Sequence, residues 1–199
     1  GTYRVMRYDV RGYGRSAMPG DESYSHTEDL KALMRHLGMD RAHLVGLSKG
    51  GGIAIDFALQ HPSLVTALVP VDSALGGFPW PADFSDSLAE IRSTANQAGL
   101  DAANDLWLTH TMLKWALLKP SVAAPLRDML SDYSGWHWLN DDPAQVLDPP
   151  AMEQLESIRS PVLSIVGQYD LPHFHSIGDT LASRVSNARR VVVSGVGHM

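Results

Sequence analysis

The sequence predicts an α/β protein in which helices flank a mostly parallel sheet. Short β-branched runs alternate with helical stretches along the chain, as expected for strands that are joined by crossover helices. Four of the five predicted strands are nearly continuous apolar runs, which is typical of strands buried on both faces. The 199 residues fit one domain that carries an insertion, and a chain of this length buries a sizeable core.

The expected elements follow from these patterns. Strands are predicted at Tyr3–Asp9, His43–Leu47, Val65–Asp72, Pro161–Gly167 and Arg190–Ser194. The first strand contains two arginines, so we expect one of its faces to lie outside the core. Three helices are predicted, the first of which shows clear helical spacing of its apolar residues: Ser25–Leu37, Gly52–Gln60 and Ile177–Ser186.

The pattern changes between residues 78 and 150, where the β-branched runs disappear. Pro79-Trp80-Pro81 marks the start of this stretch, and Asp148-Pro149-Pro150 marks its end, because prolines interrupt regular structure. We interpret it as a mainly helical cap that is inserted into a core made of residues 1–77 and 151–199. The insertion holds all five tryptophans, which either form its own small core or line a substrate pocket: Trp80, Trp107, Trp115, Trp136 and Trp138.

Composition excludes several kinds of partner. Sixteen Lys and Arg against 22 Asp and Glu give a net charge of −6, which repels phosphate backbones, so we expect no nucleic-acid partner. The absence of cysteine excludes disulfides, thiolate catalysis and cysteine-ligated metals. No apolar stretch approaches the roughly 20 residues of a membrane span, and no signal-peptide pattern opens the chain, so we expect no membrane partner and a cytoplasmic location.

The strongest functional signal is the run from Gly46 to Gly51, G-L-S-K-G-G, between a predicted strand and a predicted helix. A sharp strand-to-helix turn of this kind forces Ser48 into strained backbone angles, and small neighbours let the chain pass. The hydroxyl then projects at a helix N-terminus, where free N–H groups favour an oxyanion. A phosphate-binding loop is the alternative, but the spacing and the Gly-Lys-Ser/Thr ending of a P-loop are absent.

A serine hydroxyl needs a base and an orienting acid, and the chain offers both after separate strands. Asp170 follows the strand Pro161–Gly167, and His198 follows the last strand on a glycine-flanked loop. The carboxyl ends of parallel strands share one edge, so these groups are expected to meet Ser48 there. Asp72 also ends a strand and is the competing candidate for the acid. The spacing His173-x-His175 suits a metal, but no third ligand accompanies it, so we expect a solvated loop and no metal site.

With these residues in view, the chain resembles the α/β-hydrolase superfamily essentially from end to end. Asp9 to Ser16 (D-V-R-G-Y-G-R-S) resembles the family's D-x-R-G-x-G-x-S turn after its fourth strand. Gln60-His61-Pro62 closes the helix after the serine, and Val71-Asp72-Ser73 follows the sixth strand. Gly167 to Asp170 and Gly197-His198 match the usual acid and histidine segments. Together these motifs are specific for the superfamily, but they do not name a substrate.

The resemblance is to the branch that holds carboxylesterases, enol-lactonases and C–C bond hydrolases with a helical cap. It implies that Ser48 is the nucleophile, that His198 is the base and that Asp170 is the acid. It also implies that the backbone N–H of Lys49 is one oxyanion donor. Epoxide hydrolases and haloalkane dehalogenases use an aspartate nucleophile, so Ser48 argues against both of those branches.

The sequence departs from the family pattern in two ways. Lys49 stands where relatives mostly carry Met or Gln, and we expect its side chain to turn toward solvent or an acidic neighbour. The match begins at the family's fourth strand and stops one residue after His198, so we expect a core truncated at both ends, without the loop that supplies the second oxyanion donor. Either the chain is a piece of a longer protein, or the short form rearranges. A rearranged sheet either pairs Tyr3–Asp9 directly with His43–Leu47 or keeps open edges through which copies form a homo-oligomer.

We therefore predict a serine hydrolase of small carboxylic esters or related acyl compounds that uses no cofactor and no metal. Phe78 and Trp80, near the entry to the cap, are the candidate pocket residues and suggest an apolar acyl or alcohol group. A C–C bond hydrolase or a cofactor-free perhydrolase is one alternative reading. A catalytically weak or inactive hydrolase-like binding module is the other.

Overall fold

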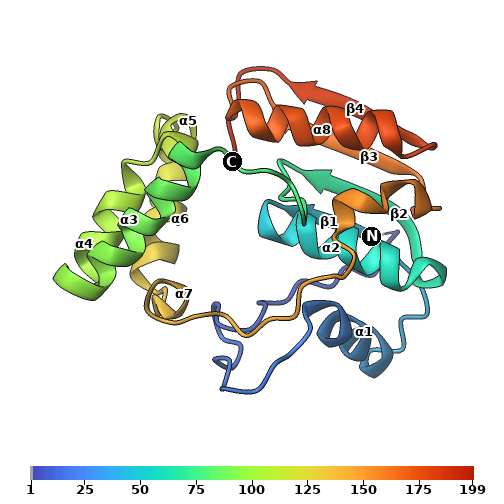
Figure 1. Ribbon diagram of the computed structural model, residues 1–199, viewed down its shortest axis with the longest axis horizontal. Coiled ribbons are helices and arrows are strands. Elements are labelled where there is room, and N and C mark those ends of the chain that lie inside the picture. Colours follow the sequence, from blue (N-terminus) through green and yellow to red (C-terminus); the bar gives the residue numbers. More distant parts are fainter. Residues whose placement is uncertain (1) are drawn as a thin grey trace.

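A computed structural model describes residues 2–199. Within this range the sheet has four parallel strands in the order β1-β2-β3-β4 (Figure 1). The strands are Ala42–Leu47 (β1), Val65–Val71 (β2), Val162–Gly167 (β3) and Ala188–Val193 (β4). Because the strands are parallel, their carboxyl ends share one edge. The prediction of an α/β fold with a mostly parallel sheet flanked by helices is confirmed.

Three helices belong to the sheet region. α2 (Lys49–Gln60) packs against β1 and β2, α8 (Pro172–Arg184) packs against β3 and β4, and α1 (His26–His36) packs against α2. Each α-helix sits near its predicted place, but α8 begins five residues before the predicted start at Ile177. Pro172 occupies its first turn, where the fixed φ of proline suits a helix and its missing N–H costs nothing.

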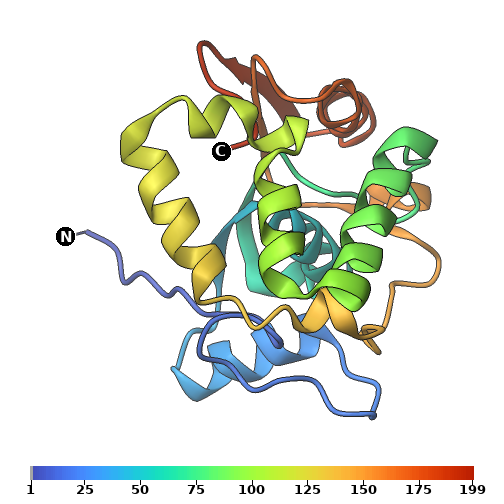
Figure 2. The same cartoon turned by 90° about the vertical axis from the view of Figure 1, so that its left-hand side faces the viewer.

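Five α-helices lie between β2 and β3: α3 (Ala82–Ala98), α4 (Leu100–Leu108), α5 (Lys114–Leu117), α6 (Pro120–Ser131) and α7 (Trp136–Leu139). The 3-10 helices of the described chain are η1 (Pro62–Leu64), η2 (Thr111–Leu113), η3 (Ala151–Glu153) and η4 (Leu155–Ser157). We call residues 78–150 the cap. Figures 1 and 2 show its helices as a separate layer beside the strand ends. The domain boundaries at 78 and 150 stay a prediction.

Local sequence explains where α1 begins and what it buries. The side chain of Ser25 accepts a hydrogen bond from the backbone N–H of Glu28 at 3.3 Å, which satisfies one free donor of the first turn. Glu28 and Asp29 in that turn carry negative charge toward the positive end of the helix dipole. Leu30 and Met34, four residues apart, are buried on one face. This face holds α1 against the core.

The main core lies between the sheet and its helices. Phe57 and Ile55 of α2 are fully buried in it, together with Leu68 of β2 and Leu181 of α8. A smaller cluster around Ile91 holds the cap helices together. Among residues 2–199, none of the helices combines the length and the apolar composition that a bilayer span requires.

The predicted strand Tyr3–Asp9 is wrong. This segment forms no strand, and Tyr3 and Val5 are 74% and 78% exposed. It does not pair with β1, and its Arg4 instead donates a hydrogen bond to the carbonyl of Leu37 at 2.7 Å. A strand needs a neighbour for its backbone N–H and C=O groups, and the described chain provides none beside this segment.

One face of the sheet is open to solvent. Val45 and Leu47 on β1 are 72% and 41% exposed, and Val191 on β4 is 44% exposed. The strand register places a row of apolar side chains across all four strands: Leu47, Val71, Ile165 and Val191. Parallel sheets are normally covered on both faces, so this row is an exposed apolar surface of an unusual kind.

We predict that this surface and the open β1 edge support association between copies of the chain. Light scattering over a range of protein concentrations should report a mass that rises above 21.7 kDa. Val45→Lys should shift the protein toward the monomer, because it places a charge on the exposed apolar face of β1, two residues before Leu47. Leu118→Lys is the matched control, since Leu118 is 65% exposed at the α5–α6 junction and lies outside the sheet. A monomer at every concentration would remove this prediction.

Candidate active site

Ser48 occupies the sharp turn between β1 and α2. Its φ of 52° is positive, and the only other non-glycine residue of the described range with a positive φ is Asp72. Two hydrogen bonds hold the turn against β2 and the chain after it: the Ser48 N–H donates to the Val71 carbonyl, and the Ala74 N–H donates to the Ser48 carbonyl, each at 3.0 Å. This strained backbone is the predicted elbow, and it directs the Ser48 side chain to the wall of a cavity.

Glycines make the elbow possible. A Cβ on Gly46 would overlap the carbonyl group of Gly50, and a Cβ on Gly51 would overlap the side chain of Ser73. Close packing of β1 onto the start of α2 therefore requires glycine at both positions. Lys49 is the first residue of α2, where backbone N–H groups have no acceptor within the helix. The elbow thus presents a free N–H beside Ser48.

Asp170 and His198 form a buried carboxylate–imidazole pair. His198 Nδ1 lies 2.8 Å from Asp170 Oδ2, and the two side chains are 2% and 0% exposed. The Leu171 N–H donates to the other oxygen, Asp170 Oδ1, at 2.7 Å, which fixes the carboxylate. The ring of Phe174 lies 4.4 Å from the His198 ring, centroid to centroid. Because a carboxylate only accepts hydrogen bonds, Nδ1 is the donor and Nε2 carries the lone pair.

Ser48 itself is not hydrogen-bonded to this pair. His198 Nε2 is buried and has no hydrogen-bond partner among residues 2–199. The structure therefore brings two of the three predicted groups into contact, while Ser48 follows β1 at the same edge of the sheet. Contacts between a catalytic serine and its base are often loose before substrate binds. The free nitrogen is the one that would accept the serine proton.

Asp72, the competing acid, does not pair with His198. Its side chain is buried, and its Oδ1 accepts a hydrogen bond from the backbone N–H of Gly167 at 2.9 Å. Burial raises the pKa of Asp72 to about 8, and the neighbouring carboxyl of Asp170 adds to this effect. Of the two candidate acids, Asp170 is therefore the one that contacts the imidazole.

A large, mainly apolar cavity of about 1270 Å³ lies between the elbow and the cap. Ser48 lines it from the core, and Trp80, Trp107 and Trp138 line it from the cap. The expectation for Trp80 fits this arrangement, but Phe78 is not among the lining residues. Its ring instead packs edge-on against Trp80 at 5.3 Å, behind the cavity wall. Part of the aromatic content of the cap therefore lines a pocket, and part supports it.

The cap also packs on the loop that carries His198. A Cβ on Gly197 would lie only 2.8 Å from Cβ of Trp115 on α5, so glycine is required at this contact. The ring of Trp115 stacks on Tyr169, next to Asp170, at 4.0 Å. The cap thus packs against the segments that carry Asp170 and His198. In Figure 1 the C-terminus lies between the cap and the strands.

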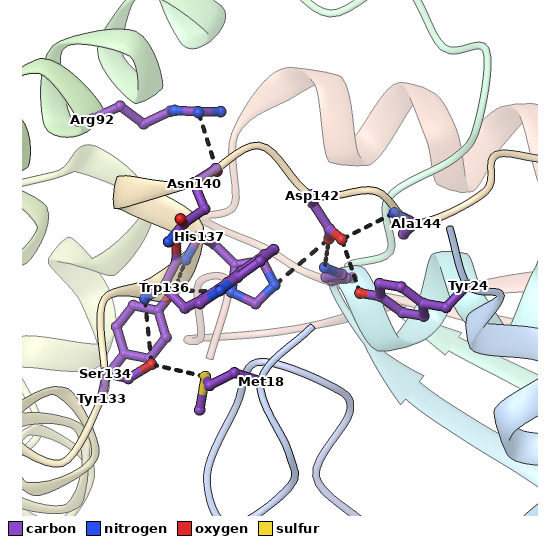
Figure 3. Close-up of polar contacts among 11 residues, drawn as sticks. Met18, Tyr24, Arg92, Tyr133, Ser134, Trp136, His137, Asn140, Asp142 and Ala144 are labelled. Atoms are coloured by element: carbon purple, nitrogen blue, oxygen red, sulfur yellow. Dashed lines mark hydrogen bonds and ion pairs between the residues drawn. The ribbon is translucent and has the colours of Figure 1, made fainter. Parts of the chain in front are cut away.

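Lys49 turns to an acidic neighbour, as expected. Its Nζ lies 3.3 Å from Asp142 Oδ2 in the cap, and it sits 5.2 Å from the centroid of the Tyr13 ring. Asp142 also accepts hydrogen bonds from the Tyr24 hydroxyl at 2.9 Å and from the Ala144 N–H at 3.1 Å (Figure 3). Burial opposes its charge, but these donors and Lys49 together lower the pKa of Asp142. Asp142 therefore joins the cap to the core beside the elbow.

His137 completes this polar corner of the cavity. Its Nε2 lies 3.6 Å from Asp142 Oδ2 (Figure 3). Burial, followed by the charge of Lys49, lowers the pKa of His137 to about 4, so this imidazole is neutral at pH 7. Sequence reasoning missed both residues. Neither lies in a motif or at a strand end, and the only signal available was the charge of Lys49, which needs a partner.

The expectation of a solvated loop at His173-x-His175 is wrong. Both residues lie in the first turns of α8, and His173 is buried against Trp80 and Phe84 with ring centroids 5.3 and 4.6 Å away. Burial lowers the pKa of His173. His175 Nδ1 contacts Arg190 on β4 at 2.5 Å. The two imidazoles therefore pack in different places.

The fold and the site together define a class of protein. A serine on a strained strand-to-helix turn, a carboxylate after a later strand and a histidine after the last strand are arranged in the chain order of α/β hydrolases. The chain belongs to that family: the family described as alpha/beta hydrolase fold matches residues 2–199.

Named relatives in this family are hydrolases of different bonds. The chain is 28% identical over 209 residues to a protein named putative carbamate hydrolase RutD from Caulobacter sp. (strain K31). The aligned region covers 98% of this chain and 74% of that protein. It is 29% identical over 212 residues to a 2-hydroxy-6-oxononadienedioate/2-hydroxy-6-oxononatrienedioate hydrolase from Paraburkholderia phymatum. Here the aligned region covers 98% of this chain and 70% of that protein.

Solved structures support the fold. The enol-lactonase from Burkholderia xenovorans LB400 superposes with a TM-score of 0.71 at 25% identity, over 96% of this chain and 72% of that one. MenH from S. aureus superposes with a TM-score of 0.77 at 19% identity, over 96% of this chain and 74% of that one, and at this identity it speaks for the fold alone. The predicted superfamily is confirmed, whereas the bond that is cleaved is not fixed by these similarities.

The elbow glycines give a direct test of the local packing. Gly46→Ala should destabilise the protein by about 1–3 kcal/mol in urea unfolding, because the new methyl group overlaps backbone that cannot move freely. Gly50→Ala is the matched control four residues away, since a Cβ there would meet no atom within 4 Å apart from its chain neighbours and the backbone of its own helix. It should be neutral or stabilise by up to about 1 kcal/mol, because alanine suits a helix better than glycine. Equal losses in both variants would contradict this packing.

Proposed function

We propose that this protein is a serine hydrolase that cleaves small carboxylic esters or related acyl compounds through an acyl-enzyme on Ser48. The observation that carries the proposal is the buried contact between Asp170 and His198, which leaves an imidazole nitrogen without a partner at the same sheet edge as the Ser48 elbow.

The roles follow from this geometry. In the proposed reaction His198 Nε2 accepts the proton of the Ser48 hydroxyl as Ser48 attacks the substrate carbonyl. Asp170 stabilises the imidazolium that forms and keeps its orientation. His198 then returns the proton to the leaving group, and water releases the acyl group by the same path in reverse.

One oxyanion donor is available at the elbow. The backbone N–H of Lys49 lies at the start of α2, and in the proposed reaction it donates a hydrogen bond to the substrate oxygen on which negative charge develops. A donor of this kind is worth about 3 kcal/mol, so an enzyme that lacks a second one would lose roughly 10²–10³ in kcat.

The cavity suggests the kind of substrate. Its lining is mainly aliphatic and aromatic, which suits an apolar acyl or alcohol group, while Lys49, Asp142 and His137 form a polar corner beside Ser48. An ester with an extended apolar acyl chain should therefore bind better than an acetate.

A C–C bond hydrolase is the second candidate. The similarity to the 2-hydroxy-6-oxononadienedioate/2-hydroxy-6-oxononatrienedioate hydrolase of P. phymatum favours it, and the same histidine and acid would serve that reaction. A 2-hydroxy-6-oxo-dienoate compound and a p-nitrophenyl butyrate ester, assayed side by side, distinguish the two candidates.

The proposal predicts hydrolysis of short p-nitrophenyl esters that depends on Ser48. Ser48→Ala should lower kcat/KM by about 10³-fold or to the buffer background, because it removes the nucleophile. The control is Ser183→Ala, since Ser183 is exposed on α8 and its hydroxyl bonds only to the Thr180 carbonyl. Equal rates for wild type and Ser48→Ala would end the ester proposal.

Labelling with a fluorophosphonate probe separates a slow enzyme from a binding protein. A slow enzyme should still form a covalent adduct that disappears in Ser48→Ala and persists in Ser183→Ala. Folded protein that takes no label would favour a hydrolase-like binding module.

A further inference from the structure

Asp72 is a buried acidic group for which the proposed mechanism has no use. It follows β2, between the elbow that follows β1 and the acid segment that follows β3. Together with Ser48 it is one of two non-glycine residues in the described range with positive φ, at 41°. Left-handed backbone at an aspartate costs free energy and persists where the surroundings enforce it. Its side chain is only 4% exposed.

The carboxyl of Asp72 sits within the catalytic cluster. One polar atom from each of Asp72, Asp170 and His198 lies within 4.8 Å of the others. The Asp72 Oδ1 accepts the Gly167 N–H at 2.9 Å, at the point where β2 and β3 diverge. Its second oxygen is therefore free of that bond. Asp170 Oδ2 is engaged by His198, and Asp170 Oδ1 accepts the Leu171 N–H.

The charges around this cluster decide which form of Asp72 is stable. Asp170 faces it from the loop after β3, and His198 faces it from the C-terminal segment. From α8, His173 interacts with Asp170 and His198 rather than with Asp72, and from α2 the ammonium of Lys49 turns away to Asp142. Two ionised carboxylates this close together in the buried interior would repel each other, which is very unfavourable.

We propose that Asp72 is a positioning residue: its carboxyl group stays protonated and donates a hydrogen bond to Asp170. This hydrogen bond keeps Asp170 Oδ2 directed at His198. This inference rests on the proposed serine-hydrolase function. In this arrangement Asp72 touches neither substrate nor the serine. It acts through Asp170, and it loses this role when it ionises, because two carboxylates at this distance repel each other.

The proposal sets an upper pH limit for the site. Burial, followed by the interaction with Asp170, raises the pKa of Asp72 to about 8. Below pH 8 Asp72 carries the proton with which it makes this hydrogen bond. At one pH unit above its pKa, only about a tenth of the molecules retain that proton. The activity of the wild type should therefore decline with a midpoint near pH 8.

The stability of the fold should also depend on pH through the ionisation of Asp72. The unfolded chain loses the Asp72 proton near the ordinary value of 3.8, whereas the folded chain holds it to about pH 8. Between these values the folded state binds more protons than the unfolded state, so the contribution of Asp72 to stability falls as pH rises through this window and is constant above it. A variant that cannot ionise should lack this part of the decline.

The test compares wild type with Asp72→Asn. The asparagine retains an oxygen for the Gly167 N–H and an amide N–H for Asp170, but it has no proton to lose. The alkaline decline of kcat/KM near pH 8 should disappear in this variant, and its Tm should fall less than that of wild type between pH 5 and pH 8. The matched control is Asp105→Asn on the exposed face of α4, which should keep the wild-type profile.

A spectroscopic measurement makes the test independent of turnover. In ¹³C-carboxyl NMR of aspartate-labelled protein, the resonance that is missing in Asp72→Asn should titrate near pH 8. A titration near pH 4 would overturn the proposal, as would identical pH–activity profiles for wild type and Asp72→Asn. A role limited to capping Gly167 predicts those identical profiles, because asparagine preserves that bond. If the protein neither hydrolyses esters nor takes the fluorophosphonate label, the proposed function fails, while the NMR titration still decides the protonation of Asp72.

Discussion

The contact between His198 Nδ1 and Asp170 Oδ2, at 2.8 Å in the buried interior, is the interaction on which the rest of the site depends. It fixes which imidazole nitrogen carries the proton, and thereby leaves Nε2 as the acceptor. The parallel sheet makes the contact possible, because residues far apart in the chain follow adjacent strands at the same edge. Every role assigned to Ser48 and Asp72 presupposes this pair.

Backbone strain is concentrated at the same edge. Ser48 follows β1 and Asp72 follows β2, and both adopt positive φ values that their side chains disfavour. Hydrogen bonds to neighbouring strands hold each of them: Ser48 bonds to Val71, and Asp72 bonds to Ile165 and Gly167. The energy for this strain comes from the packed core below, where the helices α2 and α8 bury their apolar faces against the sheet. The stable part of the fold thus supports the reactive part.

Sequence patterns predicted those features that depend on local geometry. The elbow, Asp170 and His198 stand at strand ends, and strand ends are visible as limits of apolar runs. Tyr3–Asp9 failed because a strand also needs a partner, which no local pattern records. The link from Lys49 to Asp142 could not be predicted either, since Asp142 lies in an irregular segment of the cap whose path is set by tertiary packing. The placement of Phe78 behind Trp80 has the same cause.

The most direct measurement of the central claim is a crystal structure of the protein after reaction with diethyl p-nitrophenyl phosphate. The account predicts a phosphoryl group bonded to Ser48 Oγ, with one of its oxygens at the Lys49 N–H and another within hydrogen-bond reach of His198 Nε2. Asp170 should keep its contact with Nδ1. Unmodified Ser48, or an adduct from which the imidazole is turned away, would contradict the claim that the three groups act as one unit.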